Sequence, residues 1–207
     1  MQSSRIFSRV TTLFLAAAVL GLTGCGYNRF QQLDEEVASQ WSEVVNQYQR
    51  RADLVPNLVQ TVKGYAAHES QVLTEVTEAR AGVGSIRVTP ELVNDEAALA
   101  RFMAAQNRMT GALSRLMVVA ENYPQLKADG LFRDLQAQLE GTENRITVAR
   151  GRYIESVKQY NVLARSFPTN LTARMFGYKP KANFTVADEA GVSNAPAVDF
   201  SAPAKKE

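Results

Sequence analysis

The chain has 207 residues, enough for one domain with a proper core plus tails, and its 8% aromatic content and seven prolines favour helices over a β-sandwich. Its 23 basic residues outnumber its 21 acidic residues, but Arg5 and Arg9 lie in the first 24 residues, which contain no acid. The remaining residues contain 21 basic and 21 acidic side chains. No positive field therefore indicates nucleic acid as a partner.

The first 24 residues have the pattern of a bacterial lipoprotein signal peptide. Arg5 and Arg9 supply a positive start, and residues 10–22 form an apolar core that is short for a membrane span of ~20 residues. Leu22-Thr-Gly-Cys25 resembles a lipobox, which implies cleavage after Gly24 and lipidation of the new N-terminal Cys25 by diacylglycerol and an acyl chain such as palmitate. The alternative is a signal-anchor helix that stays attached.

Cys25 is the only cysteine, so no disulfide or cysteine metal site competes for it. Several acyl chains, at ~0.8 kcal/mol per buried methylene, give stable membrane anchoring. Gly26 follows the cysteine, and in the sorting rule of Gram-negative bacteria a residue other than aspartate there favours the outer over the inner membrane. We therefore expect a lipoprotein of the cell envelope that faces the periplasm.

The rest of the chain contains amphipathic stripes, in which apolar residues recur at three- and four-residue steps and indicate helices. The first stripe predicts a helix over residues 28–51. The second begins at Asp53, a good helix cap, with Pro56 in the tolerated first turn, and it ends near Gly82. A tight turn at residues 53–56 would separate the two helices, and a continuous, kinked helix is the alternative.

Two further stripes follow a loop over residues 85–94. The third predicts a helix over residues 95–122, and Pro124 ends it because proline disfavours helix in the residue before it. The fourth predicts a helix over residues 128–166, ended by Pro168. Four long stripes joined mostly by short connections predict an all-α fold, an antiparallel four-helix bundle with coiled-coil-like packing.

The predicted domain organisation has three parts. Residues 1–24 are the signal peptide, and residues 25–180 are the bundle. Residues 181–207 are rich in Ala, Val, Asp, Ser and Pro without periodicity, which predicts a disordered tail.

Conventional catalytic and metal-binding motifs are absent from the sequence. His68-Glu69 suggests a zinc metalloprotease, but the second histidine would have to occupy position 72, which is Val72, and His68 is the only histidine. One histidine cannot supply the two Glu-x-x-His motifs of a di-iron bundle either. With no GxSxG motif and no phosphate-binding glycine loop, we predict no catalytic residues, no cofactor and no metal.

Polar residues at three stripe positions, Glu69, Gln106 and Thr142, lie at a similar predicted height in the bundle, and Glu36 comes close to them if the first two helices form a hairpin. These four residues form a candidate buried layer. Such a layer generally fixes the register of helix pairing at some cost in stability, and a site for a small ligand or cation is the alternative.

Arg50, Arg51 and Asp53 are candidate partner-facing residues. In a bundle with a turn at residues 53–56 they lie at the end away from the membrane. The alternative is that the arginines only meet the C-terminal helix dipole and solvent.

Several motifs in their order along the chain resemble the LemA family. They are Arg50-Arg-Ala-Asp-Leu-Val-Pro-Asn-Leu-Val59, Val62-Lys-Gly-Tyr-Ala-Ala-His-Glu69, Val76-Thr-Glu-Ala-Arg80, Ala120-Glu-Asn-Tyr-Pro124, Leu126-Lys-Ala128, Leu139-Glu-Gly-Thr-Glu-Asn-Arg-Ile146 and Ser166-Phe-Pro168. The resemblance implies a membrane-attached helical bundle. It also implies membrane peptidases and TPM-domain proteins as partners, because some family members are associated with them.

These observations predict a non-enzymatic, lipid-anchored envelope protein that acts as an adaptor or scaffold for other envelope proteins and meets membrane lipid through Cys25. The alternative is a ligand- or cation-sensing or hydrolase-like protein that uses the polar layer. An adaptor should show exposed apolar or mixed residues on a bundle face, whereas a sensor should show a cavity around Glu69.

Overall fold

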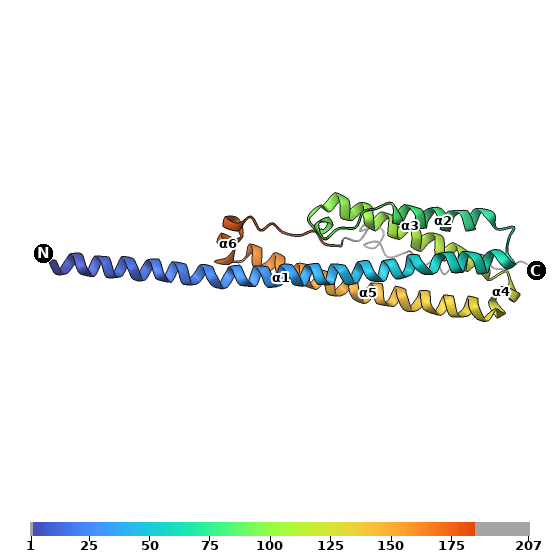
Figure 1. Cartoon of the computed structure of the whole chain (residues 1–207), viewed down its shortest axis with the longest axis horizontal. Helices are drawn as coiled ribbons and strands as arrows, with labels where there is room; N and C mark the ends of the chain where they lie inside the picture. Colours follow the sequence, from blue (N-terminus) through green and yellow to red (C-terminus); the bar gives the residue numbers. More distant parts are fainter. Residues whose placement is uncertain (1, 185–207) are drawn as a thin grey trace, which may run out of the picture.

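The computed structural model describes residues 2–184, with side chains from Gly26 onward except Pro90. This part of the chain contains helices and no strand, so the predicted all-α fold is confirmed (Figure 1). Within it, no helix is both long enough and apolar enough to cross a membrane. In chain order the elements are α1 (Gln2–Tyr65), α2 (Ser70–Gly84), the 3-10 helix η1 (Pro90–Asn94), α3 (Glu96–Ala120), α4 (Pro124–Ala128), α5 (Gly130–Arg165) and α6 (Thr169–Phe176).

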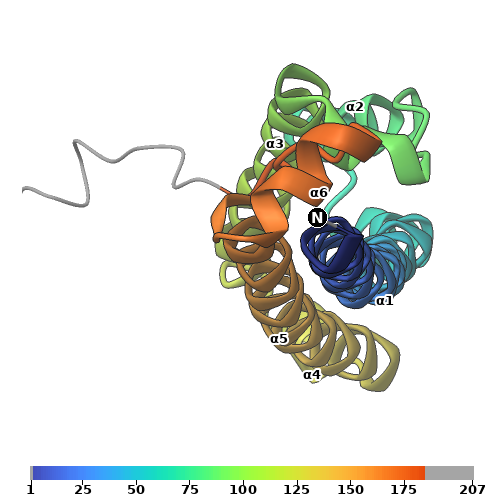
Figure 2. The ribbon, with the colours of Figure 1, turned by 90° about the vertical axis from the view of Figure 1, so that its left-hand side faces the viewer.

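The helices form an elongated bundle around α1. Helix α5 packs along α1, α2 packs on the C-terminal part of α1, and α3 packs mainly on α2. The N-terminal part of α1 projects alone beyond the bundle (Figure 1). Helix α6 lies beside α1 at the point where α1 leaves the bundle. Viewed end-on, α3 and α5 lie on the same side of the molecule (Figure 2). They contact each other far less than α3 contacts α2 or α5 contacts α1.

The core follows the predicted stripes in two adjoining clusters of apolar side chains. One cluster surrounds Phe30, Trp41 and Tyr153 near the end where α1 projects. The other surrounds Leu58 and Leu116 toward the opposite end. Burial of these side chains, each worth about 1.5–3 kcal/mol, holds the long helices side by side.

The predicted turn at residues 53–56 is wrong, because α1 continues through Pro56 to Tyr65. Proline has no backbone N–H, so it leaves the carbonyl of Ala52, four residues earlier, without its helical partner. The Nε of Arg80 on α2 donates to this carbonyl at 3.1 Å. The helix therefore tolerates Pro56 because a neighbouring helix supplies the missing hydrogen bond.

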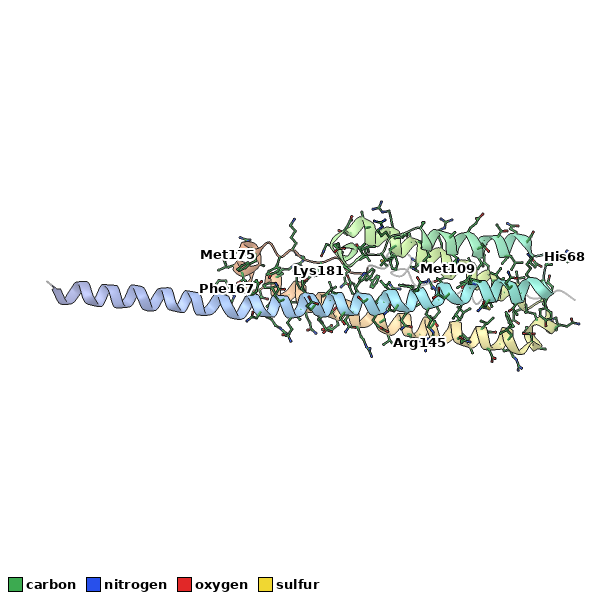
Figure 3. All side chains as sticks on the ribbon, viewed as in Figure 1. His68, Met109, Arg145, Phe167, Met175 and Lys181 are labelled. Atoms are coloured by element: carbon green, nitrogen blue, oxygen red, sulfur yellow. The ribbon has the colours of Figure 1, made fainter. Side chains whose placement is uncertain are left out.

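The reversal between the first two helices lies instead at residues 66–69, so that α2 covers only the second half of the predicted helix over residues 53–82. No proline or glycine marks residues 66–69. The far end of the bundle is consequently formed by this turn and by α4, and Figure 3 shows His68 there. Residues 50–53 lie inside α1 rather than at a helix end.

The later elements agree more closely with the sequence. Helices α3 and α5 end within two residues of the predicted boundaries. The Asp129 side chain caps α5 by accepting from the backbone N–H of Phe132 at 2.8 Å. Pro124 begins the short α4 rather than a loop.

The segment after α6 remains in contact with the bundle up to residue 184. Gly177 ends α6 in the left-handed conformation at φ 75°. Ala182 then donates its N–H to the carbonyl of Val93 at 3.0 Å, and the Tyr153 hydroxyl donates to the carbonyl of Ala182 at 2.9 Å. The predicted disordered tail, 181–207, therefore begins too early, and residues 185–207 lie outside the described part of the chain.

Candidate functional site

The most unusual side chain of the bundle is Arg51 of α1, which is 1% exposed. Its Nη1 donates to the Thr110 hydroxyl at 2.8 Å and to the Glu143 carboxylate at 2.7 Å. Its Nη2 donates to the Gln106 side-chain oxygen at 2.6 Å and to the Gln106 carbonyl at 3.2 Å. One guanidinium thus joins α1 to α3 and α5, two helices that contact each other little.

A buried cation needs both a counter-charge and hydrogen bonds, and Arg51 has both. The side chain of Arg51 is 2% exposed, whereas that of Glu143 is 42% exposed, so the ion pair runs from the interior to the surface. The Tyr48 ring lies 5.1 Å from the guanidinium carbon, within the range of a cation–π contact. Burial raises the pKa of Tyr48, against the opposing effects of Arg150 and Arg51.

The orientation of the Gln106 amide follows from Arg51. Its oxygen accepts from the guanidinium, because the NH₂ group in that place would meet another donor. The Gln106 Nε2 is buried and has no hydrogen-bond partner among the described residues. Gln106 also lines a cavity of about 420 Å³ between α1, α2 and α3, together with Tyr48 and Arg80.

Only two of the four residues of the predicted polar layer are buried. Gln106 and Thr142 are both buried, at 3% and 0% exposure. The Thr142 hydroxyl donates to the carbonyl of Gln138 in its own helix, at 2.7 Å, rather than to the Arg51 cluster.

The other two members of the predicted layer lie elsewhere, so the proposed four-residue layer is wrong. Glu36 is exposed on α1 and accepts from Gln40 at 2.8 Å. Glu69 is in the α1–α2 turn, because the helix reverses there, and it accepts from the Tyr123 hydroxyl at 2.9 Å. That hydrogen bond raises the pKa of Tyr123.

The prediction that Arg51 faces a partner is also wrong. Arg50 and Asp53 are exposed, and Asp53 accepts from Gln49 at 2.8 Å. Arg51 is buried because the inward stripe does not stop at the predicted turn. The stripe runs through Val44, Tyr48, Arg51, Val55, Leu58 and Val62 at three- and four-residue steps. Reading the stripe across residues 53–56 would have identified Arg51 as an inward-facing residue.

A groove of about 560 Å³ lies between α3 and α5. Leu113 and Met117 of α3 and Leu139 of α5 supply apolar lining, and Gln136 and Glu140 add polar groups. Thr110 and Glu143, which hold Arg51, also line this groove. Two hydrogen-bond partners of Arg51 therefore belong to the lining of an open groove with both apolar and polar side chains.

The groups at this site are hydrogen-bond donors and acceptors and one paired charge. Among the described residues, no group of three or more His, Cys, Asp or Glu could hold a metal ion. The cluster around Arg51 offers hydroxyl, amide, carboxylate and guanidinium groups, with neither cysteine nor histidine among its named members. A groove lined by both apolar and polar side chains suits the recognition of another molecule.

These features define a class of protein, an elongated helical bundle whose long first helix is tied to its neighbours by a buried arginine. The LemA family profile matches residues 40–200, so the chain belongs to the LemA family. Three of the motifs that resemble this family meet at the site. The motif over residues 50–59 contains Arg51 and Pro56, the motif over residues 76–80 contains Arg80, and the motif over residues 139–146 contains Glu143. Glu143 accepts from Arg51, and Arg80 donates to the carbonyl of Ala52.

The chain is also similar to three curated proteins. Magnetosome proteins MamQ 1 and MamQ 2 of Paramagnetospirillum magneticum (strain AMB-1) are each 26% identical over 169 residues, 74% of this chain and 62% of theirs. Magnetosome protein MamQ of Magnetospirillum gryphiswaldense (strain MSR-1) is 26% identical over 189 residues, 81% of this chain and 70% of its own. The chain thus spans less than two thirds of the two P. magneticum proteins.

Proposed function

We propose that this protein is a lipid-anchored, non-enzymatic adaptor of the cell envelope that holds other envelope proteins in the groove between α3 and α5. Its family membership and its similarity to magnetosome proteins support membrane association. The Leu22–Cys25 lipobox supports anchoring through Cys25, and Gly26 favours the outer membrane.

The observation that carries the adaptor role is the mixed groove on a bundle face. Helices α3 and α5 are held apart with Arg51 between them, and apolar side chains of both helices line the space. An amphipathic partner helix would suit this groove, with its apolar face toward Leu113, Met117 and Leu139. A lysine or arginine on that helix would meet Glu140, since Glu143 is already paired with Arg51.

Site-specific photo-crosslinking in native membranes tests this role, with one photoreactive residue introduced into the full chain at a time. Gln136 lines the groove, and Gln138, two residues along the same helix, is an exposed matched control outside the groove lining. We expect a discrete protein adduct from position 136 and none from position 138, with the partner identified by mass spectrometry. Equal adducts at both positions, or none at 136, would contradict the groove as the binding surface.

A second candidate function has one specific observation in its favour. The buried Gln106 Nε2 has no partner among the described residues, and Gln106 lines the cavity of about 420 Å³ beside Tyr48 and Arg80. A small apolar molecule with one hydrogen-bond acceptor would suit that cavity. If the chain is a sensor, mass spectrometry of the natively purified protein should detect such a molecule in wild type, and Gln106→Leu should lose it.

A further inference from the structure

Large exposed apolar side chains gather in and just before α6. Phe167 is 81% exposed, Leu171 57%, Met175 63% and Phe176 51%. Figure 3 shows Phe167 and Met175 at the end of the bundle from which α1 projects, opposite His68. Four such residues within ten positions form a patch of the kind that marks an interaction surface.

The opposite face of α6 seats it against the first helix. Thr172 and Ala173 are buried, and a Cβ placed on Gly26 would lie 3.2 Å from the Thr172 hydroxyl oxygen. The Tyr27 ring packs against the Phe176 ring in a tilted arrangement, with 5.0 Å between ring centroids. Helix α6 is therefore fixed beside Gly26, the residue that follows Cys25.

This position sets the distance of α6 from a membrane. A lipid on Cys25 would place Gly26 within one residue, ~3.5 Å of chain, of the attachment point. An uncleaved apolar segment over residues 10–22 would bring the same part of α1 to the bilayer. Under either form of attachment, the outer face of α6 lies at the membrane surface.

The charge of this region suits an anionic lipid surface. Residues 156–184 contain five basic residues and no aspartate or glutamate. Among them, Arg165, Arg174 and Lys179 are exposed and flank the apolar patch. Basic side chains beside an apolar face are the composition of helices that lie in the interface of a bilayer.

We propose that Phe167 and α6 form a foot that inserts Phe167, Leu171 and Met175 into the headgroup region of the membrane. Arg165 and Arg174 bind lipid phosphates beside it. This inference rests on the proposed membrane attachment and adds a second, non-covalent contact to it. The foot holds the bundle at a defined angle, which a short tether alone would leave free.

Photo-crosslinking to lipid in the full-length, membrane-borne protein tests the foot. A photoreactive residue at Leu171 is compared with one at Leu131, which has nearly the same exposure, 59%, but lies at the start of α5 near the far end of the bundle. We expect phospholipid adducts, detected by mass, from position 171 and none from position 131. Arg174→Glu should reduce the yield at 171 several-fold in membranes that contain anionic lipid.

The outcomes distinguish failure of the foot proposal from failure of the proposed membrane attachment. Equal lipid labelling at 171 and 131, or none at 171 while the protein remains in washed membranes, overturns the foot and leaves membrane attachment standing. A protein adduct in place of lipid at 171 overturns the foot in favour of a protein interface. Recovery of the wild-type protein in the soluble fraction overturns both the foot and the proposed attachment.

Discussion

At the scale of single residues, the bundle depends on how Arg51 is neutralised. Glu143 is the carboxylate that the structure pairs with it, and Gln106 and Thr110 supply the neutral acceptors. Removal of one member of a buried ion pair leaves an uncompensated charge in a poorly solvated place. The resulting loss of folding stability is larger than the net stability that the pair contributes. The stability of the α1, α3 and α5 arrangement should therefore be sensitive to Glu143.

Glu143→Gln should lower the free energy of unfolding by about 2 kcal/mol. This is less than the about 3–5 kcal/mol of a fully buried pair, because the Glu143 side chain is 42% exposed and water reaches it. Chemical denaturation monitored by circular dichroism measures the change. Glu140→Gln, an exposed neighbour on the same helix, is the matched control and should change stability by less than about 0.5 kcal/mol. Equal effects would show that Arg51 does not depend on Glu143.

Asp129 gives a prediction about pH. The backbone N–H of Phe132 and then the Tyr65 hydroxyl, by donating to its carboxylate, lower the pKa of Asp129 below its ordinary value of 3.8. A lowered folded-state pKa gives stability above the unfolded-state value and loses it as pH falls through the folded-state value. Wild type should melt higher than Asp129→Asn at pH 6, and the gap should close below about pH 3.8. A gap unchanged at pH 3 would contradict the role of the charge.

At the scale of elements, the sequence predicts the stripes well and one boundary poorly. The inner faces of α3 and α5 could be predicted because the three- and four-residue spacing is unbroken. The boundary near Pro56 could not, because proline usually opens or ends a helix and the group that compensates for it, Arg80, is 24 residues away in sequence. The real turn at residues 66–69 carries no glycine or proline to mark it.

The wrong turn at residues 53–56 also explains why the sequence did not indicate the Arg51 site. A predicted turn at residues 53–56 places Arg51 at a helix end, where a charge is ordinary, and shifts Glu69 onto the inward stripe. Gln106 and Thr142 lie on helices whose register was predicted correctly, and both are buried. The partners of Arg51 come from α3 and α5, so only the folded arrangement shows them together.

The contact between Arg80 and the Ala52 carbonyl can be tested by a double-mutant cycle with Pro56. Arg80→Met keeps the apolar stem but removes the donor, and should cost about 1 kcal/mol because the carbonyl loses its partner. In a Pro56→Ala background the restored backbone N–H satisfies that carbonyl, so the same change should cost clearly less. Denaturation curves of the four proteins give the coupling. Identical costs in both backgrounds would disprove the compensation.

At the scale of the whole molecule, the proposed attachment makes the bundle a rod held at one end. The projecting part of α1 and α6 lie at one end, and His68 lies at the other (Figures 1 and 3). Gly26 lies against Thr172 of α6. Helix α2 ends partway along α1, where Gly84 and Gln49 line one cavity.

The attachment itself is tested by Cys25→Ser. Only a thiol can receive the diacylglycerol, so the variant should remain an unlipidated, uncleaved precursor, whereas mass spectrometry of the wild type should find lipid on Cys25 at the mature N-terminus. Retention of residues 1–24 in the mature wild-type protein would reject the lipoprotein form and favour the signal-anchor helix.

The central claim is that the bundle stands on the membrane by its Gly26 and α6 end, and the most direct test is the distance of the opposite end from the bilayer. From Gly26 to Tyr65 helix α1 rises ~1.5 Å per residue, or about 58 Å in all. Fluorescent amino acids at Tyr27 and His68, in full-length protein in vesicles with acceptor-labelled headgroups, report this distance by energy transfer. We predict strong transfer from position 27 and little from position 68. Comparable transfer from both positions would show a bundle lying flat and would contradict the account.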